Sequence, residues 1–302
     1  MFQFEINCTK HIAVYQILRR QKHEKMVLYY VRVGAAGNYC LKRKTMSIQS
    51  QIKKICSSLR IKDDRFIEIE RKRKLRLEDF KELRDFLTKN SSSHEKTASF
   101  FDQYLDTKDT AIAKKGASLR IRYKQDGGKV YVQYKGPGFL HKGILFRSEF
   151  NSGKLPGVVL KASHKRFVRF NEQNLRAIMF NHLPEEMSEA MKTHLGPKIL
   201  SKISVGNLIC FYKKEKFIVN RSSIILEPSL DKICSFYVRG ECIYPMATFC
   251  EYENEIKAES NSLEDKLKNL HHLVKFDERV ISNFALPAES KDKYHRCLSF
   301  FI

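Results

Sequence analysis

The chain has 302 residues, of which 42% are hydrophobic and 11% aromatic, a composition that excludes a disordered tail protein. Fifty-six Lys and Arg residues against 34 Asp and Glu residues give a formal net charge of +22. A protein with this excess of positive charge is expected to bind a polyanion.

Eight cysteines are scattered along the chain without a CxxC pair. This spacing argues against a zinc knuckle or a thioredoxin-like redox site, and buried reduced thiols are the expectation. No apolar run approaches the roughly 20 residues that a membrane-spanning helix needs. We therefore expect a cytoplasmic protein with no membrane partner.

The positive charge is concentrated near the N-terminus. Residues 1–62 contain thirteen Lys and Arg residues and only two acidic ones, Glu5 and Glu24. We expect three parts: a basic N-terminal region of uncertain fold (1–62), a main domain (63–275) and a C-terminal extension (276–302). The basic region is either a solvated extension or a binding segment for RNA or polyphosphate.

A strict alternation of charged and apolar residues marks the start of the main domain, at residues 65–74. In a strand, Glu68, Glu70 and Lys72 share one face while Ile67 and Ile69 share the other. Two carboxylates this close repel each other unless a cation lies between them, so this face suits a ligand. The alternative is an ordinary solvated strand face.

Helices and strands then follow each other along the chain. Apolar residues at helical spacing predict a helix over residues 78–89, followed by a strand at 100–105 and a short helix that Gly116 ends. An Asp-Gly-Gly sequence between two alternating runs predicts a β-hairpin of residues 117–124 and 129–135. Residues 144–151 alternate again.

The second half is predicted to contain helices and further short strands. The helices are expected at 171–183, 184–200 and from Ser262 to about 274, and the strands at 208–212, 216–219, 224–227, 230–237 and 249–257. Strand after strand is charged on one face and apolar on the other. The predicted fold is therefore α+β: an antiparallel β-barrel of about eight strands with a charged lumen and helices packed outside.

Five short motifs occur in order and together resemble the CYTH family of triphosphate tunnel metalloenzymes, over about residues 65–274. They are Glu68-x-Glu70-x-Lys72, Tyr104-Leu105-Asp106-Thr107, Lys115-Gly116-Ala117-Ser118-Leu119-Arg120-Ile121-Arg122, Tyr134-Lys135-Gly136-Pro137-Gly138 and Arg147-x-Glu149. The resemblance implies an eight-stranded tunnel that binds a triphosphate and a divalent metal, Mg²⁺ or Mn²⁺.

The resemblance also implies roles for individual residues. The implied phosphate-binding residues are Lys72, Arg120, Arg122, Lys135 and Arg147. The implied metal-binding residues are Glu68, Glu70, Glu149, Asp231, Glu251, Glu253 and Glu255, with Glu227 competing with Asp231 for the late acidic position. The implied catalytic residues are Glu68, Glu70, Lys72 and Glu253. Such a mixture agrees with phosphoryl transfer, which needs cations for phosphate oxygens and carboxylates for a hard metal ion.

The sequence departs from the family pattern at several positions. Asn151 stands where many relatives have an acid after Arg-x-Glu, and Asp231-Lys232 stands where Asp-Arg is expected. The strand after Pro197 offers Lys202 and then Ser204, Gly206 and Leu208. These departures predict a second half of the tunnel with fewer basic residues, and a reduced or altered activity.

The leading functional hypothesis is hydrolysis of a triphosphate, most economically inorganic triphosphate, by a metal-activated water. Within the same fold, the alternatives are a class IV type adenylate cyclase, an RNA 5′-triphosphatase and an enzyme that handles polyphosphate. A non-catalytic module that binds polyanions or nucleotides is the alternative from outside enzymology. The oligomeric state is not predicted by any of these features.

Overall fold

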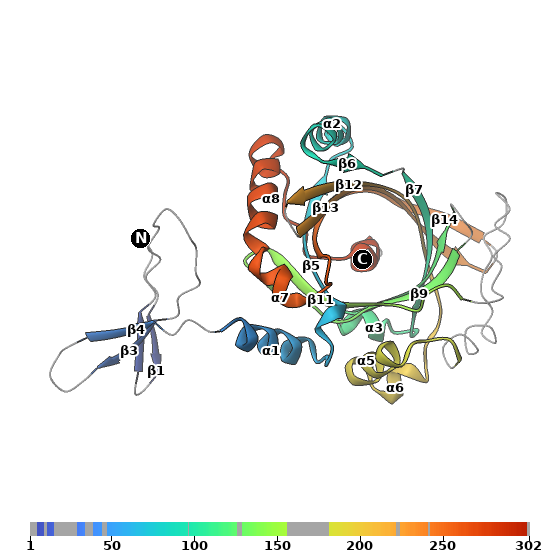
Figure 1. The fold of residues 1–302 in the computed structure, drawn as a ribbon. Coiled ribbons are helices and arrows are strands. Elements are labelled where there is room, and N and C mark those ends of the chain that lie inside the picture. Colours follow the sequence, from blue (N-terminus) through green and yellow to red (C-terminus); the bar gives the residue numbers. More distant parts are fainter. Residues whose placement is uncertain are drawn as a thin grey trace. The chain divides into compact units, whose positions relative to one another are not determined.

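The computed structural model describes residues 5–8, 11–14, 29–33, 39–43, 47–95, 97–125, 129–155, 181–221, 224–240 and 242–300 (Figure 1). The chain divides into two compact units, residues 1–51 and 52–302. In the first unit β1 (Glu5–Cys8) pairs with β2 (His11–Val14), and β3 (Tyr29–Val33) pairs with β4 (Tyr39–Arg43), both in antiparallel fashion.

The second unit is a closed antiparallel barrel, which confirms the predicted fold. Around the barrel the strand order is β11-β5-β14-β13-β12-β7-β8-β9, and pairing of β9 with β11 closes the ring. Its strands are β5 (Ile67–Leu75), β7 (Ala98–Asp106), β8 (Ser118–Lys124), β9 (Lys129–Lys135), β11 (Ile144–Asn151), β12 (Ser204–Arg221), β13 (Ile224–Arg239) and β14 (Cys242–Ala258). The short strands β6 (Ser93–His94) and β10 (Phe139–His141) add to β12 and β11.

Three long strands replace the short strands predicted for the second half. The predicted breaks at 213–215 and 228–229 are wrong, because β12 and β13 run through both stretches in register with each other. The charged run around Lys214 keeps the alternation of a strand, and Pro228 is accommodated opposite Asn254 of β14. An irregularity does occur earlier in β12, between Val205 and Ile209.

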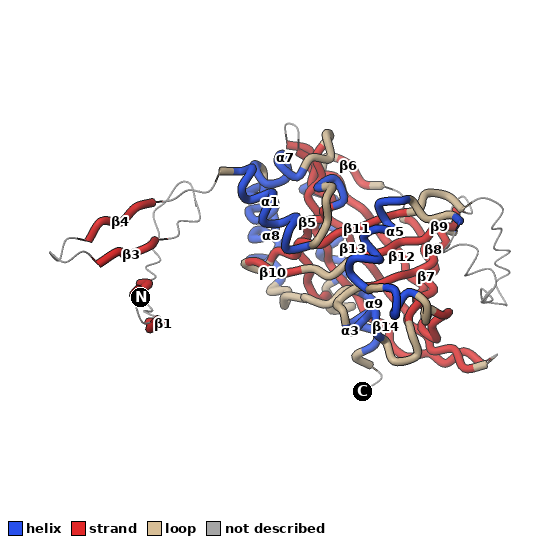
Figure 2. The backbone as a smooth tube through the Cα atoms, turned by 90° about the horizontal axis from the view of Figure 1, so that it is seen from below, coloured by secondary structure: helices blue, strands red, loops and turns tan. Residues whose placement is uncertain are grey.

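Helices surround the barrel wall (Figure 2). They are α1 (Ile48–Leu59), α2 (Phe80–Asn90), α3 (Ala111–Lys114), α5 (Glu185–Leu195), α6 (Pro197–Leu200), α7 (Leu263–Lys268) and α8 (Leu270–Phe284). The single helix predicted from Ser262 is thus two helices with a break at Asn269. Most of the helix predicted at 171–183 lies outside the described residues. None of the described helices is long and apolar enough to cross a membrane.

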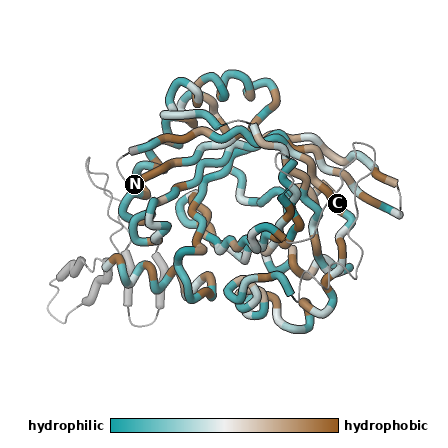
Figure 3. The backbone as a smooth tube through the Cα atoms, turned by 45° about the vertical axis from the view of Figure 1, so that its right-hand side comes forward, coloured by the Kyte–Doolittle hydropathy of each residue, from teal (hydrophilic) through white to brown (hydrophobic). Residues whose placement is uncertain are grey.

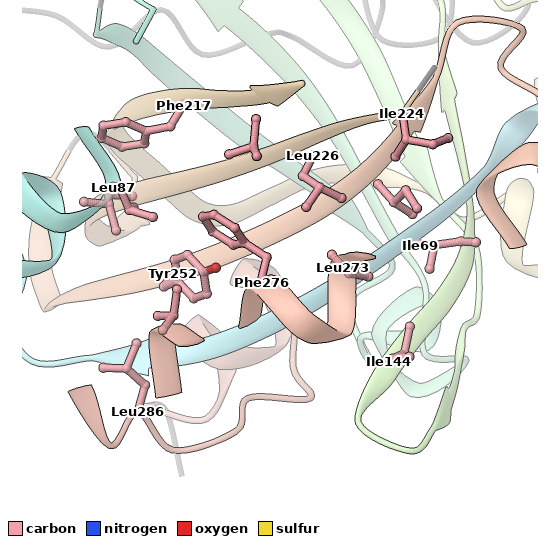
Figure 4. Close-up of a cluster of buried hydrophobic side chains, with 14 of the residues drawn as sticks. Ile69, Leu87, Ile144, Phe217, Ile224, Leu226, Tyr252, Leu273, Phe276 and Leu286 are labelled. Atoms are coloured by element: carbon pink, nitrogen blue, oxygen red, sulfur yellow. The ribbon is translucent and has the colours of Figure 1, made fainter. Parts of the chain in front are cut away.

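The outward-facing apolar residues of the strands form the core beneath these helices. On one side Ile69 of β5, Tyr252 of β14 and Leu226 of β13 pack against Leu273 and Phe276 of α8 (Figure 4). On another, residues of β8 and β9 pack against Met187 and Met191 of α5. Burial of these apolar faces forces the opposite, charged faces of the same strands into the lumen.

The C-terminal part of the chain enters the lumen. Helix α9 (Lys293–Leu298) lies inside the ring of strands (Figure 1). Its Tyr294 and Cys297 are buried in an inner apolar cluster with Tyr104, Tyr212 and other strand residues. The Tyr294 ring stacks on that of Tyr104 with 4.5 Å between centroids. One end of the lumen is therefore an apolar core, and the rest carries the charged residues.

Candidate functional site

The charged part of the lumen surrounds a cavity of about 210 Å³. The alternation of hydrophilic and hydrophobic residues along the strands is visible in Figure 3. Every predicted phosphate-binding residue lines this cavity, as do Glu68, Glu149, Glu253 and Glu255. Lining residues that the sequence reading did not select include Tyr131, Gln133, Tyr212, Lys214, Lys216, Lys257, Asp292 and Lys293.

Strand register brings the first-strand glutamates against basic residues of β9 and β11. Arg147 of β11 lies opposite Glu68 of β5, and its Nε donates to Glu68 Oε2 at 3.0 Å while Nη2 donates to Glu70 Oε1 at 2.8 Å. Lys135 of β9 donates to Glu68 Oε2 at 2.9 Å and pairs with Glu149 Oε2 at 2.6 Å. Burial raises the pKa of Glu68, but Lys135 and Arg147 outweigh it and hold that pKa well below its usual range.

A second group joins β7, β8 and β9 around Asp102. Asp102 is fully buried, and its carboxylate accepts from Arg122 Nε at 2.7 Å and Arg122 Nη2 at 2.8 Å and pairs with Arg120 Nη1 at 2.9 Å. Arg120 also donates to the Gln133 side chain. Burial opposes ionisation of Asp102, but the two guanidinium groups lower its pKa. One carboxylate thus holds two forked donors side by side toward the cavity.

Three acids gather on β13 and β14 at the third group, which we call the acidic trio: Asp231, Glu251 and Glu253. Within the described part of the chain, theirs is the one set of three potential ligand residues whose ligand atoms all lie within 4.8 Å of one another. Asp231 Oδ1 and Glu251 Oε2 are buried and accept no hydrogen bond from the described residues. Hard oxygen donors with unused lone pairs fit Mg²⁺ or Mn²⁺.

Basic side chains already surround the acidic trio. Lys72 Nζ lies 2.8 Å from Glu253 Oε1, and Lys214 Nζ donates to Glu253 Oε2 at 2.8 Å. Arg296 Nη1 lies 3.2 Å from Glu251 Oε1. Burial disfavours charge on Lys214, but Asp231 and Glu253 outweigh it and raise its pKa above the usual range. These groups keep the trio charge-compensated without a metal ion.

The remaining predicted acids lie apart from the trio. Glu255 is paired with Lys257, and burial, with Glu68 and Glu149 nearby, raises the pKa of Glu255 to about 7. Glu227 pairs with Lys216 at 2.8 Å and also lines the cavity. Of the two competing candidates for the late acidic position, Glu227 lines the cavity and Asp231 belongs to the acidic trio, so the choice between them stays a prediction. The assignment of Glu68, Glu70, Glu149 and Glu255 as metal ligands stays a prediction.

The positions that depart from the family pattern lie away from the cavity. Asn151 is exposed, and its Oδ1 accepts from the Gly153 backbone N–H at 2.9 Å. Lys202 and Lys232 are also exposed. The second half of the barrel supplies its basic residues from other positions, Lys214 and Lys216 of β12 and Lys257 of β14.

Some of the cavity residues that were not predicted could have been found from the strand alternation in the sequence. Lys257 continues the Glu251, Glu253, Glu255 alternation, and Lys214 and Lys216 share a strand face with Tyr212. Asp102 lies directly opposite Arg122 in the β7–β8 pairing. Asp292 and Lys293 had no such signal, because they lie at the start of a short helix outside the predicted tunnel domain.

A histidine with two oxygen partners lies in the first turn of helix α9. His295 Nδ1 lies 2.6 Å from Asp292 Oδ1, and its Nε2 lies 3.0 Å from the Ala113 carbonyl oxygen. Both ring nitrogens face acceptors, so the imidazolium satisfies both. Burial lowers the pKa of His295, but Asp292 outweighs it and raises that pKa above the ordinary 6.5.

A His295→Gln substitution is therefore expected to destabilise the protein in a pH-dependent way. A raised pKa means that protonated His295 favours the folded state; this stabilisation is full below the unfolded pKa and is lost as pH rises through the folded one. We expect a loss of about 1.5–3 kcal/mol in the free energy of unfolding at pH 5.5, as for hydrogen bonds to charged groups, and less at pH 9. Urea unfolding at both pH values measures it; an equal loss at both would contradict the charged histidine.

Part of the barrel is similar to a known protein family. Residues 67–175, which include β5 to β11, match the CYTH domain family model. This part of the chain is similar to the CYTH domain. The comparison with curated proteins gave no match.

The fold of the chain also resembles solved structures at low sequence identity. A Bacillus halodurans protein named as an adenylate cyclase is 18% identical, with a TM-score of 0.44 over 76% of this chain and 96% of that one. A Hippeastrum protein with dominant triphosphatase activity is 18% identical, with a TM-score of 0.43 over 77% and 95%. The mimivirus capping-enzyme triphosphatase is 12% identical, with a TM-score of 0.36 over 76% and 100%.

Proposed function

We propose that the protein hydrolyses a triphosphate, with inorganic triphosphate the leading substrate, in the charged lumen of the barrel. The observation that carries the proposal is that one wall of the cavity carries arginine and lysine side chains while a cluster of three acids, of which Glu253 lines the cavity, lies on other strands. The arginine and lysine side chains lie on β8, β9 and β11 (Arg120, Arg122, Lys135, Arg147), whereas the acidic trio lies on β13 and β14. A phosphate chain needs the first kind and a divalent metal ion the second.

The residues of the lumen would act mainly by positioning and charge neutralisation. Arg120 and Arg122, held by Asp102, would grip non-bridging oxygens, and Lys135 and Arg147 would exchange a carboxylate partner for a phosphate oxygen. Asp231, Glu251 and Glu253 would hold Mg²⁺ or Mn²⁺, which supplies Lewis-acid polarisation of the phosphate and activation of water. Glu255, with its pKa near 7, is suited to accept a proton from the attacking water at neutral pH.

A product assay with a panel of substrates tests this proposal. The purified protein is mixed with Mg²⁺ or Mn²⁺ and, in turn, inorganic triphosphate, ATP, thiamine triphosphate and 5′-triphosphate RNA. RNA is included because residues 1–62 are strongly basic. We expect orthophosphate from inorganic triphosphate. Cyclic AMP and pyrophosphate from ATP would instead support the cyclase, and binding without turnover a non-catalytic module.

The variant for the same assay is Glu68→Gln, which removes a carboxylate that holds both Lys135 and Arg147. We expect turnover to fall by about 10²- to 10³-fold, as when a transition-state donor loses its position. Glu78→Gln is the matched control, because Glu78 is exposed and lies outside the barrel strands. Equal turnover of the two variants would remove Glu68 from the mechanism.

A further inference from the structure

Lys293 of α9 occupies the centre of the acidic trio. Its Nζ lies 2.7 Å from Asp231 Oδ2, 2.7 Å from Glu253 Oε1 and 3.2 Å from Glu251 Oε2. Lys72 reaches only Glu253 of the three, Lys214 reaches Glu253 and Asp231, and Arg296 reaches Glu251. Among these cations of the described chain, Lys293 is the one that contacts all three carboxylates.

Lys293 lies at the cavity, whereas two of the three acids that it contacts do not. Asp231 and Glu251 are fully buried and do not line the cavity, whereas Lys293 and Glu253 do. A cation that enters the cavity therefore meets Lys293 before it can reach the two deeper carboxylates. Asp231 Oδ1 is buried without a hydrogen bond from the described residues, and Glu251 Oε2 has Lys293 Nζ as an ion-pair partner at 3.2 Å.

The backbone of α9 is held in place, so the mobile part is the Lys293 side chain. Tyr294 donates from its hydroxyl to Asp106 Oδ2 at 2.7 Å, and the Cys297 Sγ lies 3.4 Å from Cys210 Sγ in the apolar end of the lumen. Asp292 accepts from Ser118 Oγ at 2.9 Å. A lysine stem has four rotatable bonds, and Nζ can swing into the cavity while these contacts persist.

From this geometry we infer that Lys293 is an internal cation that holds the acidic trio in place of a divalent metal ion, so that Nζ and the metal compete for the same three carboxylates. The inference rests on the proposed function, because it concerns how that site is loaded. A divalent ion bound by all three carboxylates would lie where Lys293 Nζ now contacts them, and the two cations would repel each other strongly in a buried site. Metal binding therefore releases the ammonium group into the cavity, where the phosphate-binding residues lie.

The competition has a second consequence for a triphosphate. Asp292, the neighbour of Lys293, has its Oδ2 3.3 Å from Arg147 Nη1, which is a predicted phosphate contact. Asp292 thus pairs with Arg147, which is predicted to bind phosphate. The next residue, Lys293, pairs with the acidic trio, which is proposed to bind the metal ion. In the free protein, Asp292 therefore occupies a phosphate-binding residue and Lys293 occupies the metal-binding acids. When a metal–triphosphate complex binds, its metal ion replaces the Lys293 ammonium group.

Free Mn²⁺ binding, read by electron paramagnetic resonance without any phosphate, tests the competition. Lys293→Met and Lys293→Gln are compared with Lys291→Met, a control that removes an exposed lysine from the same segment. We expect both Lys293 variants to bind Mn²⁺ at least about tenfold more tightly than wild type, and the control to bind like wild type. Lys293 variants no tighter than the control would overturn the inference.

If the variants fold poorly, a measurement on the wild-type protein tests the competition between Lys293 and the metal ion. Reductive methylation followed by mass spectrometry reports the reactivity of each lysine. Lys293, whose side chain is 7% exposed, is expected to react slowly relative to Lys291, and its relative rate is expected to rise several-fold at saturating Mn²⁺. Unchanged protection of Lys293 with Mn²⁺ bound would overturn the inference. Absence of orthophosphate release alongside increased Lys293 reactivity would reject the hydrolase reaction and leave the competition intact.

Discussion

An Asp102→Asn variant is expected to lose about 3–5 kcal/mol of folding free energy, the effect of removing one partner from a buried ion pair. Asp102 is 0% exposed, and its two oxygens form ion pairs with both Arg120 and Arg122. Asparagine keeps the shape but leaves two adjacent buried guanidinium groups without an anion. Because natural domains have only about 5–15 kcal/mol of stability, urea unfolding should show a large shift.

The same variant also tests whether this pair of arginines binds phosphate. If it does, inorganic triphosphate supplies the missing anion, and it should raise the melting temperature of Asp102→Asn by more than it raises that of the wild type. Asp85→Asn is the control for stability, since Asp85 is exposed on α2, and we expect a change within about 0.5 kcal/mol. An Asp102→Asn protein as stable as this control would show that the arginines need no counter-ion here.

The first half of the site could be predicted from the sequence for two reasons. Alternation of charged and apolar residues fixes which side chains face the lumen, and a hairpin fixes the register of the two strands that it joins. Ile67 and Ile69 must be buried, which turns Glu68 and Glu70 inward, and the antiparallel pairing of β8 with β9 aligns Arg120 with Gln133. These are local rules: a strand period of two and a short loop. The chemistry of the lumen wall follows from them without knowledge of the rest of the barrel.

The start of β12 could not be placed by the same rules. The strand is irregular between Val205 and Ile209, and there Gly206 passes so close to β7 that a Cβ would lie 2.6 Å from the Tyr104 carbonyl oxygen. The even-numbered residues from Lys202 to Leu208 include one basic residue, which suggested few basic residues in this strand. Lys214 and Lys216, further along the same strand and beyond the irregularity, line the cavity.

Helix α9 shows a different limit of sequence reasoning. Its position depends on contacts with residues far away in the chain, such as Asp106 and Asp231, and on space left inside the closed barrel. Periodicity within six residues does not encode which surface a helix packs on. The fit of its apolar residues to the inner cluster around Tyr104 and Tyr212 is visible only after closure.

The lumen is organised as pairs of opposite charges that a ligand can exchange. Arg147 holds Glu68 and Glu70, Lys135 holds Glu68 and Glu149, and Lys293 holds the acidic trio. Each buried charge is thus compensated before a ligand arrives, which avoids the cost of an isolated charge. Binding of a metal–triphosphate complex would then rearrange existing partners, with little further desolvation of the side chains.

A Lys135→Met variant is expected to lower triphosphate turnover by at least about 100-fold, the scale of losing one preorganised donor to a transferring phosphoryl group. The substitution keeps the length of the side chain and removes a cation that lines the cavity. Glu68 retains Arg147 and Glu149 retains Gln133, so folding should change far less than turnover. Lys129→Met is the matched control, because Lys129 is exposed at the other end of β9. Steady-state orthophosphate release with thermal unfolding of both variants separates the two effects: a turnover loss shared by the control, or one explained by unfolding, would remove Lys135 from the phosphate-binding set.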